Sequence, residues 1–396
     1  MAKSQIAQSN KPFSFLDLDK ELSKIEGFEL GSLLANNSFS EVDEWIPTGN
    51  YLLNAQISGS LFGGIPNTRS FGLMGDPGTG KSFVCLNVVR EAQKKGYDVV
   101  YCDTEGAIDK TGALKFGIDA NRLRYQPIKT VSQFQTFVAN LVDMVNKARA
   151  KGESPKILLI LDSLGMLSTD KELADAMRGH NAADMGAKAK ELRKLFRVIT
   201  LDLTAAKIPL ICTNHVYTGG GFMPTKESSG GDGPIFAMSV ISFLSKAQLK
   251  EGSSTTKTGI VVTSNLKKSR FTVPEQVKFH ISFANGMNPY VGLQDYVSWD
   301  ACGVERGKLE EVKGPDGKKE IKFTANASST RWAVKHLGKT VTTSELFTAK
   351  VFTPEVLEQL DNKVIKSKFH LPEPVSYTHL RAHETGRNLV CRLLLE

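Results

Sequence analysis

The stretch GDPGTGKS at residues 75–82 has the residue types and the spacing of a loop that binds phosphate. It fits the pattern G-x-x-x-x-G-K-[ST], in which glycines let backbone N–H groups surround an anion and a lysine neutralises it. A short apolar run at 71–74 precedes the loop, and a helix-like segment at 83–96 follows it. This order favours a nucleotide site over a glycine-rich turn that binds nothing. The expected nucleotide contacts are Gly75, Asp76, Pro77, Gly78, Thr79, Gly80, Lys81, Ser82 and Phe83.

Hydrolysis at such a loop needs a cation and a metal ion. Lys81 is positioned to neutralise the β- and γ-phosphates, which makes it a catalytic candidate, and Ser82 is positioned to coordinate Mg²⁺. The run KILLILDS at 156–163 ends an apolar strand in Asp162, at the sheet edge where open α/β sheets bind nucleotides. We therefore predict a Mg²⁺ site made by Ser82 and Asp162, with Asp162 acting through water. The alternative for Asp162 is a residue that only caps the next turn.

Further polar residues end two other predicted strands. VVYCDTEGAID at 99–109 contains Glu105, the candidate to orient the attacking water, and Asp103, which suits a structural cap. LICTNH at 210–215 ends in Asn214 and His215, which can contact the γ-phosphate and sense its loss. The alternative for Asn214 and His215 is a plain turn.

The elements that must position these residues alternate between strand and helix from about 45 to 290. This alternation predicts an α/β fold with a mostly parallel central sheet. Expected strands are 71–75, 98–103, 157–162 and 209–213, and expected helices include 131–149 and 186–205. From 239 onward, three successive strand-like runs predict an antiparallel extension of the sheet.

Composition and charge narrow the function classes. The chain has 396 residues with 41% hydrophobic content, enough for a sizeable core, and no apolar run long enough for a membrane span. Five scattered cysteines and an N-terminus without a secretory apolar stretch favour a cytoplasmic protein with reduced thiols. The net charge is +8, but residues 1–50 carry −4, so the rest carries about +12. The basic remainder suits a polyanionic partner. An acidic N-terminal segment followed by a basic remainder also suits head-to-tail self-association.

Changes in pattern along the chain suggest four parts. Residues 1–44 contain a short amphipathic helix at 13–30 and are expected to be an N-terminal oligomerisation segment. Residues 45–295 form the expected ATPase core, and 296–374 a small C-terminal region with two short strands and helical stretches. The last part, 375–396, matches nothing else in the chain and is interpreted as a non-native tail.

The ordered set of motifs resembles the RecA family of homologous recombinases, and within it the phage members. The matching text is IPTGNYLLNAQISGSLFGGIPNTRSFGLMGDPGTGKS, YCDTEGAID, LLILDSLGMLS and CTNHVYTGGG…SGGDGPIFAMS, and the likeness covers about residues 45–295. The resemblance implies a RecA-like P-loop ATPase core with an antiparallel extension of its sheet. If the gene is phage-borne, it also implies action in the cytoplasm of a bacterial host.

The resemblance assigns roles residue by residue. Glu105 matches the catalytic glutamate, Asp162 the metal-side aspartate, and His215 the relay between nucleotide and DNA. Lys268 and Arg270 fall where family members place cations that reach the nucleotide of a neighbouring subunit; the alternative is a solvated strand end. The family often stacks adenine on an aromatic side chain close to Gly112, so base recognition is open here, with Tyr101 and Phe116 as candidates.

Two segments follow the nucleotide strands where the family places its DNA loops, at 165–194 and 216–234. The second is rich in glycine, so a loop that orders only with nucleotide is expected, although a plain surface loop would also fit. The expected DNA contacts are Arg178, Gly219, Gly220, Gly221, Phe222, Met223, Lys226, Gly230 and Gly231, joined by the basic side of helix 186–205.

The function that the resemblance implies is ATP-dependent DNA strand exchange by a helical filament on single-stranded DNA, with ATP and Mg²⁺ as ligands. Expected partners are single-stranded DNA, homologous double-stranded DNA, further copies of the chain, and single-strand-binding and mediator proteins, with no membrane. A replicative-helicase-type motor and a nucleotide-gated single-strand-binding protein without strand exchange are the alternatives.

Overall fold

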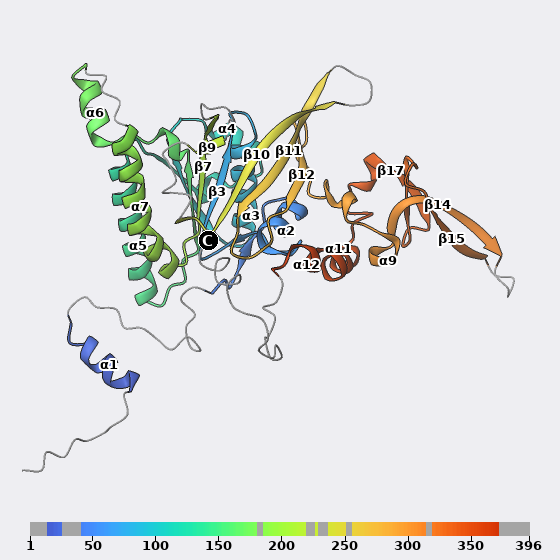
Figure 1. Cartoon of the computed structure of the whole chain (residues 1–396), viewed down its shortest axis with the longest axis horizontal. Helices are drawn as coiled ribbons and strands as arrows, with labels where there is room; N and C mark the ends of the chain where they lie inside the picture. The colour runs from blue at the N-terminus through green and yellow to red at the C-terminus, as the bar shows by residue number, and fades with distance from the viewer. Residues whose placement is uncertain are drawn as a thin grey trace, which may run out of the picture.

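A nine-stranded sheet forms the centre of the protein, with the strand order β13-β12-β11-β10-β3-β7-β6-β4-β5 (Figure 1). The computed structural model describes residues 14–25, 41–179, 185–218, 226–228, 237–250, 256–313 and 319–371. The strands of the sheet are β3 (Ser70–Gly75), β4 (Asp98–Asp103), β5 (Leu123–Pro127), β6 (Ile157–Asp162), β7 (Leu210–Asn214), β10 (Val240–Lys250), β11 (Lys257–Lys268), β12 (Gln276–Ser282) and β13 (Gly286–Met287).

Six neighbouring strands, from β10 to β5, run parallel, and β11, β12 and β13 continue the sheet in antiparallel pairs. The predicted α/β fold with a mostly parallel sheet and an antiparallel extension is therefore confirmed. The first of the three runs expected in the extension, β10, pairs in parallel with β3, so antiparallel pairing begins between β10 and β11.

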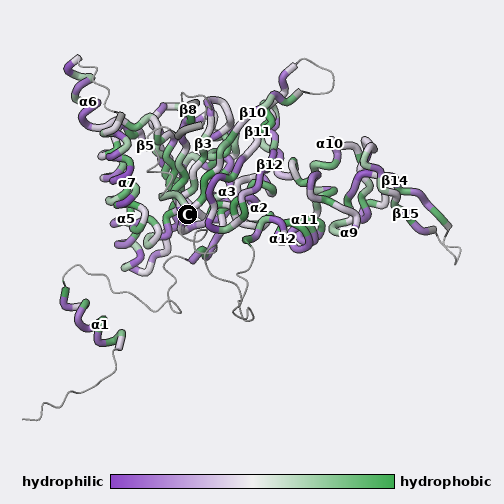
Figure 2. The backbone as a smooth tube through the Cα atoms, viewed as in Figure 1, coloured by the Kyte–Doolittle hydropathy of each residue, from purple (hydrophilic) through white to green (hydrophobic). Residues whose placement is uncertain are grey.

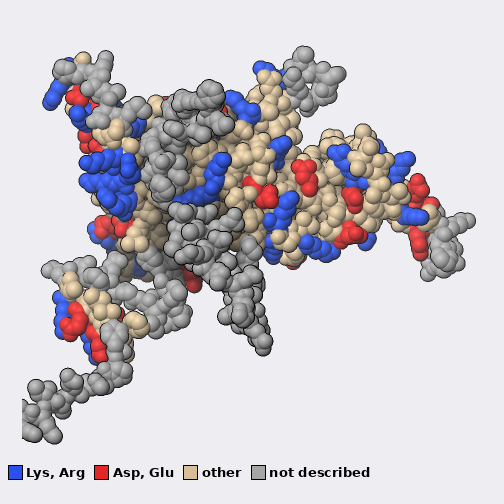
Figure 3. All heavy atoms as spheres, viewed as in Figure 1, with Lys and Arg blue, Asp and Glu red and all other residues tan. Residues whose placement is uncertain are grey.

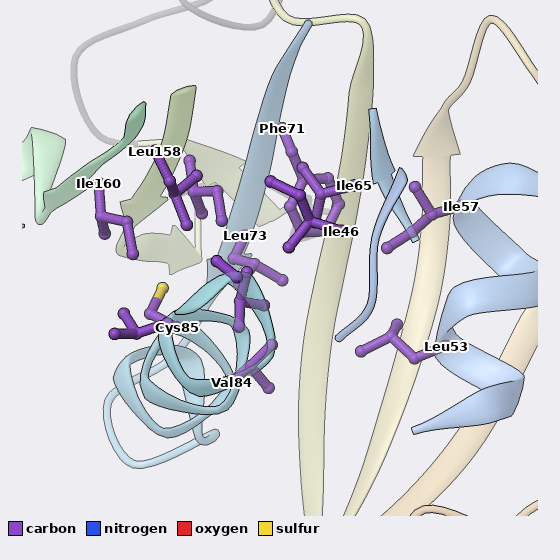
Figure 4. Close-up of a cluster of buried hydrophobic side chains, with 14 of the residues drawn as sticks. Ile46, Leu53, Ile57, Ile65, Phe71, Leu73, Val84, Cys85, Leu158 and Ile160 are labelled. Carbon is purple, nitrogen blue, oxygen red and sulfur yellow. The ribbon is translucent and has the colours of Figure 1, made fainter. Parts of the chain in front are cut away.

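Helices cover both faces of the parallel part, because its strands are apolar on both sides. On one face, α3 (Lys81–Lys94) packs against side chains such as Phe71, Leu73 and Ile160, which Figure 4 shows around Val84 and Cys85. On the other face, α5 (Val131–Ala150) and α7 (Met185–Ala205) pack against Leu159 and Leu161. Each fully buried Leu, Ile or Phe contributes about 1.5–3 kcal/mol. Figure 2 shows the hydrophobic positions along the central strands.

An apolar stripe of α7 is buried against the sheet. It consists of Leu192, Leu195, Phe196, Ile199 and Leu203, all at most 2% exposed. The opposite side of α7 carries the basic residues Lys190, Arg193, Lys194 and Arg197, all exposed. The helix is therefore fixed by one face and presents positive charge on the other.

Residues beyond the central sheet form a second, smaller sheet of β14 (Val304–Lys313), β15 (Lys319–Ala325), β16 (Arg331–Val334) and β17 (Lys339–Thr342), in the order β15-β14-β16-β17. Short helices accompany it: α9 (Trp299–Cys302), α10 (Thr343–Leu346), α11 (Pro354–Leu360) and α12 (Lys366–Phe369). A third apolar cluster joins this region to α2 (Tyr51–Ser58). Buried Asp361 accepts hydrogen bonds from Ser60 Oγ (2.8 Å) and Leu61 N (2.6 Å), which ties the region to the loop after α2.

Near the N-terminus, α1 (Phe15–Leu22) lies apart from the rest of the described chain (Figure 1). None of its residues is buried, and Phe15 and Leu16 are 62% and 71% exposed. The amphipathic helix expected at 13–30 is present but shorter. No helix in the described part of the chain combines the length and apolar character needed to cross a membrane.

Candidate active site

The glycine loop joins the end of β3 to the start of α3, as the sequence predicts. Gly78 and Gly80 have φ angles of 72° and 91°, a conformation that glycine adopts without strain. Gly80 is the N-cap of α3 and makes no side-chain cap, so the first N–H groups of the helix remain available to an anion. The ammonium of buried Lys81 donates to the carbonyls of Gly75 (2.8 Å) and Asp76 (3.2 Å). A phosphate therefore fits this loop in shape and in charge.

The strands next to the loop also require its glycines. A Cβ atom on Gly75 would lie 2.8 Å from the Leu244 carbonyl oxygen of β10, and one on Gly80 would lie 2.6 Å from Ile281 Cδ1 of β12. Lys246 of β10 donates to the Pro77 carbonyl at 2.8 Å. The contacts of the loop with β10 and β12 were not predicted from the sequence, because they depend on the register between strands that are distant in the chain.

The remaining loop residues occupy the expected positions. The Thr79 hydroxyl donates to the Asp76 carbonyl at 2.8 Å, which closes the turn. Ser82 lies half-buried in the first turn of α3. Phe83 packs edge-on against Phe116, with ring centroids 4.7 Å apart.

Asp162, at the end of β6, is 6% exposed, and both of its carboxylate oxygens accept hydrogen bonds. Tyr101 OH donates to Oδ2 at 2.6 Å, and the Thr213 hydroxyl donates to Oδ1. These two hydroxyls hold the carboxylate towards the loop, a role that was not predicted for them. The prediction of Tyr101 as a candidate for stacking on the base was wrong, because its side chain is 0% exposed and a nucleotide base cannot reach it.

Asp103, at the end of β4, has the structural role that the sequence offered as its alternative. Its Oδ1 atom accepts from the backbone N–H groups of Glu105 and Gly106, each at 2.9 Å. This cap fixes the loop so that the Glu105 side chain turns towards β6 and β7.

Glu105 is held by two neighbours. Ser163 Oγ donates to Glu105 Oε1 at 2.8 Å, and His215 Nε2 lies 3.1 Å from the same oxygen. Burial acts to raise the pKa of Glu105, but these hydrogen bonds and the charges of His215 and Lys81 outweigh it and hold the pKa below its ordinary value. The contact of Ser163 with Glu105 was not predicted. The only sequence signal for the position of Ser163 was that it directly follows Asp162.

The carboxylates of Asp162 and Glu105 also act on Lys81, the lysine of the loop. Burial lowers the pKa of Lys81, while the negative charges of Asp162 and Glu105 act against this effect. The structure therefore brings Lys81, Asp162 and Glu105 together at the carboxyl edge of β3, β6 and β4. A charged group that enters here meets one buried cation and two carboxylates.

Asn214 and His215 lie at the same edge, at the end of β7. Asn214 is fully buried, and its Oδ1 atom accepts from His215 N at 2.9 Å. The buried Nδ1 of His215 has no hydrogen-bond partner among the described residues. His215 thus connects Glu105 to the chain that continues into β8 (Val216–Thr218).

Lys268 and Arg270 do not join this site. Lys268 ends β11, and its Cα partner is Ile241 at the start of β10, opposite Gly72 of β3. These two cations therefore lie at the amino edge of the parallel strands, away from the glycine loop of the same chain.

Most residues expected to contact DNA lie outside the described part of the chain: Gly219, Gly220, Gly221, Phe222, Met223, Gly230 and Gly231. Lys226 begins β9 (Lys226–Ser228), which pairs with β8. Arg178 is exposed at the C-terminal end of α6 (Asp170–Met177). In Figure 3, Lys and Arg side chains form a blue region at the left of the view, where α7 lies. Lys188 of α7 donates to the Gly165 carbonyl at 2.6 Å.

The residues present fit a metal held jointly with a nucleotide. Among the described residues, no group of three or more His, Cys, Asp or Glu side chains gathers as metal ligands. Ser82 and Asp162 are the oxygen donors beside the loop, and Mg²⁺ is commonly held by few protein oxygens together with phosphates and water.

A cavity of about 310 Å³ lies beside the first turns of α3. Phe83, Phe116 and Phe283 line it together with Asn87 and Arg90. Phe283 is 69% exposed, which is unusual for a phenylalanine and leaves a ring face accessible.

Comparison with known proteins gives one family. The RecA N-terminal domain family matches residues 17–288. The chain is 30% identical over 286 residues to the recombination and repair protein of Enterobacteria phage T4, covering 70% of each chain. It is 28% identical over 302 residues to the protein RecA of Streptomyces coelicolor, covering 74% of each, and 26% identical over 273 residues to the protein RecA of Treponema denticola, covering 68% of this chain and 62% of that one.

Proposed function

Because the chain belongs to the RecA family, it is a strand-exchange recombinase of DNA recombination and repair, and we propose that it acts as an ATP-dependent filament on single-stranded DNA. The observation that carries this proposal is the meeting of Glu105, Ser163 and His215 beside Lys81. This arrangement joins a residue suited to hydrolysis to the strand that leads into the glycine-rich segment.

The glycine loop binds the triphosphate through its N–H groups, and Lys81 leaves the carbonyls of Gly75 and Asp76 to neutralise it. Ser82 and Asp162 would hold Mg²⁺, and the bound ion would supply positive charge to the phosphates. Tyr101 and Thr213 keep the Asp162 carboxylate aimed at the loop. A buried hydrogen-bond network thus orients the carboxylate that would hold the ion.

Glu105 orients the attacking water and accepts its proton. Its lowered pKa keeps the carboxylate ionised at neutral pH, which this role requires. Ser163 fixes the direction of the carboxylate, because its hydroxyl donates to the oxygen that also faces His215.

His215 transmits the state of the nucleotide to the DNA-binding segment. It contacts Glu105 and continues directly into β8, so a movement of Glu105 changes the strand that precedes residues 219–225. The path between hydrolysis and DNA release is therefore short: one hydrogen bond from Glu105 to His215, and then the backbone into β8.

The nucleotide site is completed by a second copy of the chain. Lys268 and Arg270 serve the loop of the neighbouring subunit; their place towards the amino edge of the parallel strands, away from their own glycine loop, supports this assignment. In the filament, residues 1–44 pack on a neighbour, 45–295 form the ATPase core and 296–374 a C-terminal region, with 375–396 as a non-native tail. The exposed apolar side chains of α1 support the first assignment.

The cavity beside α3 receives the adenine base. Phe283 offers an exposed ring for stacking, and Phe83 directly follows Ser82 of the loop. This position takes the place of the aromatic residue that the family often has near Gly112.

Single-stranded DNA binds along the segments that follow β6 and β7. Arg178, Lys226 and the basic side of α7 contact phosphates, and residues 219–223, 230 and 231 contact the strand in the nucleotide-bound state. Such contacts carry no sequence information, so homology to double-stranded DNA is tested by base pairing. Single-strand-binding and mediator proteins are further partners, and the phage relative supports action in a bacterial host.

The direct test is DNA-stimulated ATP hydrolysis and homologous strand pairing by Glu105→Gln, with exposed Glu153→Gln as the matched control. We expect Glu105→Gln to bind nucleotide and DNA but to lose turnover, while the control behaves as wild type. Wild-type turnover in Glu105→Gln would refute the catalytic assignment. Unwinding of a forked duplex without homologous pairing would instead favour the helicase-type motor.

A further inference from the structure

A third cation, Arg69, lies beside the pair formed by Lys268 and Arg270. Arg69 immediately precedes β3 and is half-buried. Its guanidinium donates to the Thr68 carbonyl at 3.1 Å, a contact with its own neighbour in the chain.

The three cations share the amino edge of the sheet. Arg69 leads into β3, Ile241 of β10 lies opposite Gly72 of β3, and Lys268 of β11 lies opposite Ile241. Three neighbouring strands thus bring Arg69 and Lys268 to the same edge.

The turn after β11, at residues 269–272, packs near the segment that leads to Arg69. The Phe271 ring packs edge-on against Trp45, with centroids 5.1 Å apart, and Trp45 pairs with Pro66. Arg69 N in turn donates to the Pro66 carbonyl at 3.4 Å. The side chains at 268–270 are therefore held against the connection that carries Arg69.

A hydrogen-bond network fixes this turn rigidly. Ser269 Oγ accepts from the N–H groups of Phe271 (3.0 Å) and Thr272 (3.1 Å). The hydroxyl of buried Thr272 donates to the Gln56 carbonyl of α2 at 2.7 Å. The turn that carries the two cations is thus anchored to the core rather than free in solvent.

The positive charges of the cluster lie close enough to influence one another. Burial and then the positive charge of Arg270 lower the pKa of Arg69, and the same two causes lower the pKa of Lys268. Like charges held close together in a fixed turn are typical of a site that receives an anion.

We propose that Arg69 is the third cation of the site that Lys268 and Arg270 present to the triphosphate bound by the neighbouring copy of the chain. This inference rests on the proposed trans site and adds a residue to it. Arg69 cannot serve the loop of its own chain, because the six residues of β3, about 20 Å of strand, separate the two. A planar guanidinium suits a phosphate better than an ammonium does, since it donates two parallel hydrogen bonds.

The first test compares Arg69→Met and Arg69→Lys with Arg124→Met, which removes an exposed arginine of β5. We expect Arg69→Met to lower DNA-stimulated turnover about tenfold or more, Arg69→Lys to retain part of it, and Arg124→Met to match wild type. A fluorescent ATP analogue should bind the isolated Arg69→Met subunit as it binds wild type. With a slowly hydrolysed ATP analogue, electron microscopy should show shorter Arg69→Met filaments on single-stranded DNA. Wild-type turnover and filament length in Arg69→Met would overturn the proposal.

The second test mixes subunits and separates a role in trans from a structural one. Glu105→Gln subunits lack hydrolysis at their own loop but keep their cations, whereas Arg69→Met subunits have the reverse defect. An equal mixture should recover about a quarter of the wild-type rate, since random mixing joins an intact loop to an intact cation set at about one interface in four. No recovery would mean that Arg69 acts within its own chain, and the inference would be wrong.

The same mixing with Lys268→Ala/Arg270→Ala tests the proposed trans site itself. If a mixture of this double variant with Glu105→Gln recovers turnover, and a mixture of Arg69→Met with Glu105→Gln does not, only the assignment of Arg69 is wrong. If the mixture with the double variant also fails to recover turnover, the trans site is refuted, and the role proposed for Arg69 is refuted with it.

Discussion

Replacement of Ser163 by alanine tests how the protein positions its catalytic carboxylate. The change removes the hydroxyl that donates to Glu105 Oε1 at 2.8 Å. A hydrogen bond to a charged group contributes about 1.5–3 kcal/mol when buried, and partial exposure of Glu105 reduces this to about 1 kcal/mol. If the bond orients the carboxylate in the transition state, turnover falls about fivefold.

The pH dependence of the Ser163→Ala variant gives a second readout, whose direction follows from the charges. The Ser163 hydrogen bond lowers the pKa of Glu105, so its removal raises that pKa. Because the ionised carboxylate is the active form, turnover is lost as the pH falls through the pKa, and the acid side of the profile should move to higher pH. A loss of stability alone would lower the rate without moving the profile.

The assay is DNA-stimulated ATP hydrolysis measured as a function of pH, with kcat and KM determined separately. Exposed Ser154→Ala is the matched control, since Ser154 precedes β6 at the end remote from Glu105. A Ser163→Ala variant whose kcat and pH profile both coincide with those of the control would show that Ser163 does not position Glu105.

Three further predictions concern the nucleotide and DNA surfaces. Lys81→Ala should abolish nucleotide binding and turnover, because it removes the buried cation of the loop; normal turnover would contradict the phosphate site. Phe283→Ala should raise KM for ATP about fivefold with little change in kcat, since stacking contributes about 1 kcal/mol; an unchanged KM would place the base elsewhere. Arg193→Ala/Arg197→Ala on α7 should weaken binding of single-stranded DNA and make its salt dependence shallower by about 1.4 in log–log slope; an unchanged slope would exclude phosphate contacts there.

The sequence was sufficient to predict the carboxyl edge of the sheet. Asp162, Glu105 and His215 each follow an apolar run, and parallel strands bring the residues that follow such runs to one edge. Their meeting did not depend on any detail of packing, so local pattern was enough.

The contacts between these residues were not predictable in the same way. Ser163 and Glu105 are 58 positions apart, and the bond between them depends on the loop that Asp103 caps. The hydroxyl contacts of Tyr101 with Asp162 depend on the register of β4 with β6. Sequence pattern gives the face of a strand but not the partner of a side chain.

The C-terminal region illustrates a second limit. A turn between two strands and a following helix were visible in the sequence, but their attachment to α2 was not. Asp361 binds the N–H group of Leu61, 300 positions earlier in the chain. An aspartate inside an amphipathic helix gives no signal that it caps a distant loop.

The central claim is that nucleotide joins successive copies of the chain on DNA. The most direct measurement is electron microscopy of the protein on single-stranded DNA, with a slowly hydrolysed ATP analogue and without nucleotide. We expect continuous, extended filaments with the analogue, and short or compact particles without it. Particles of the same length and pitch under both conditions would contradict it.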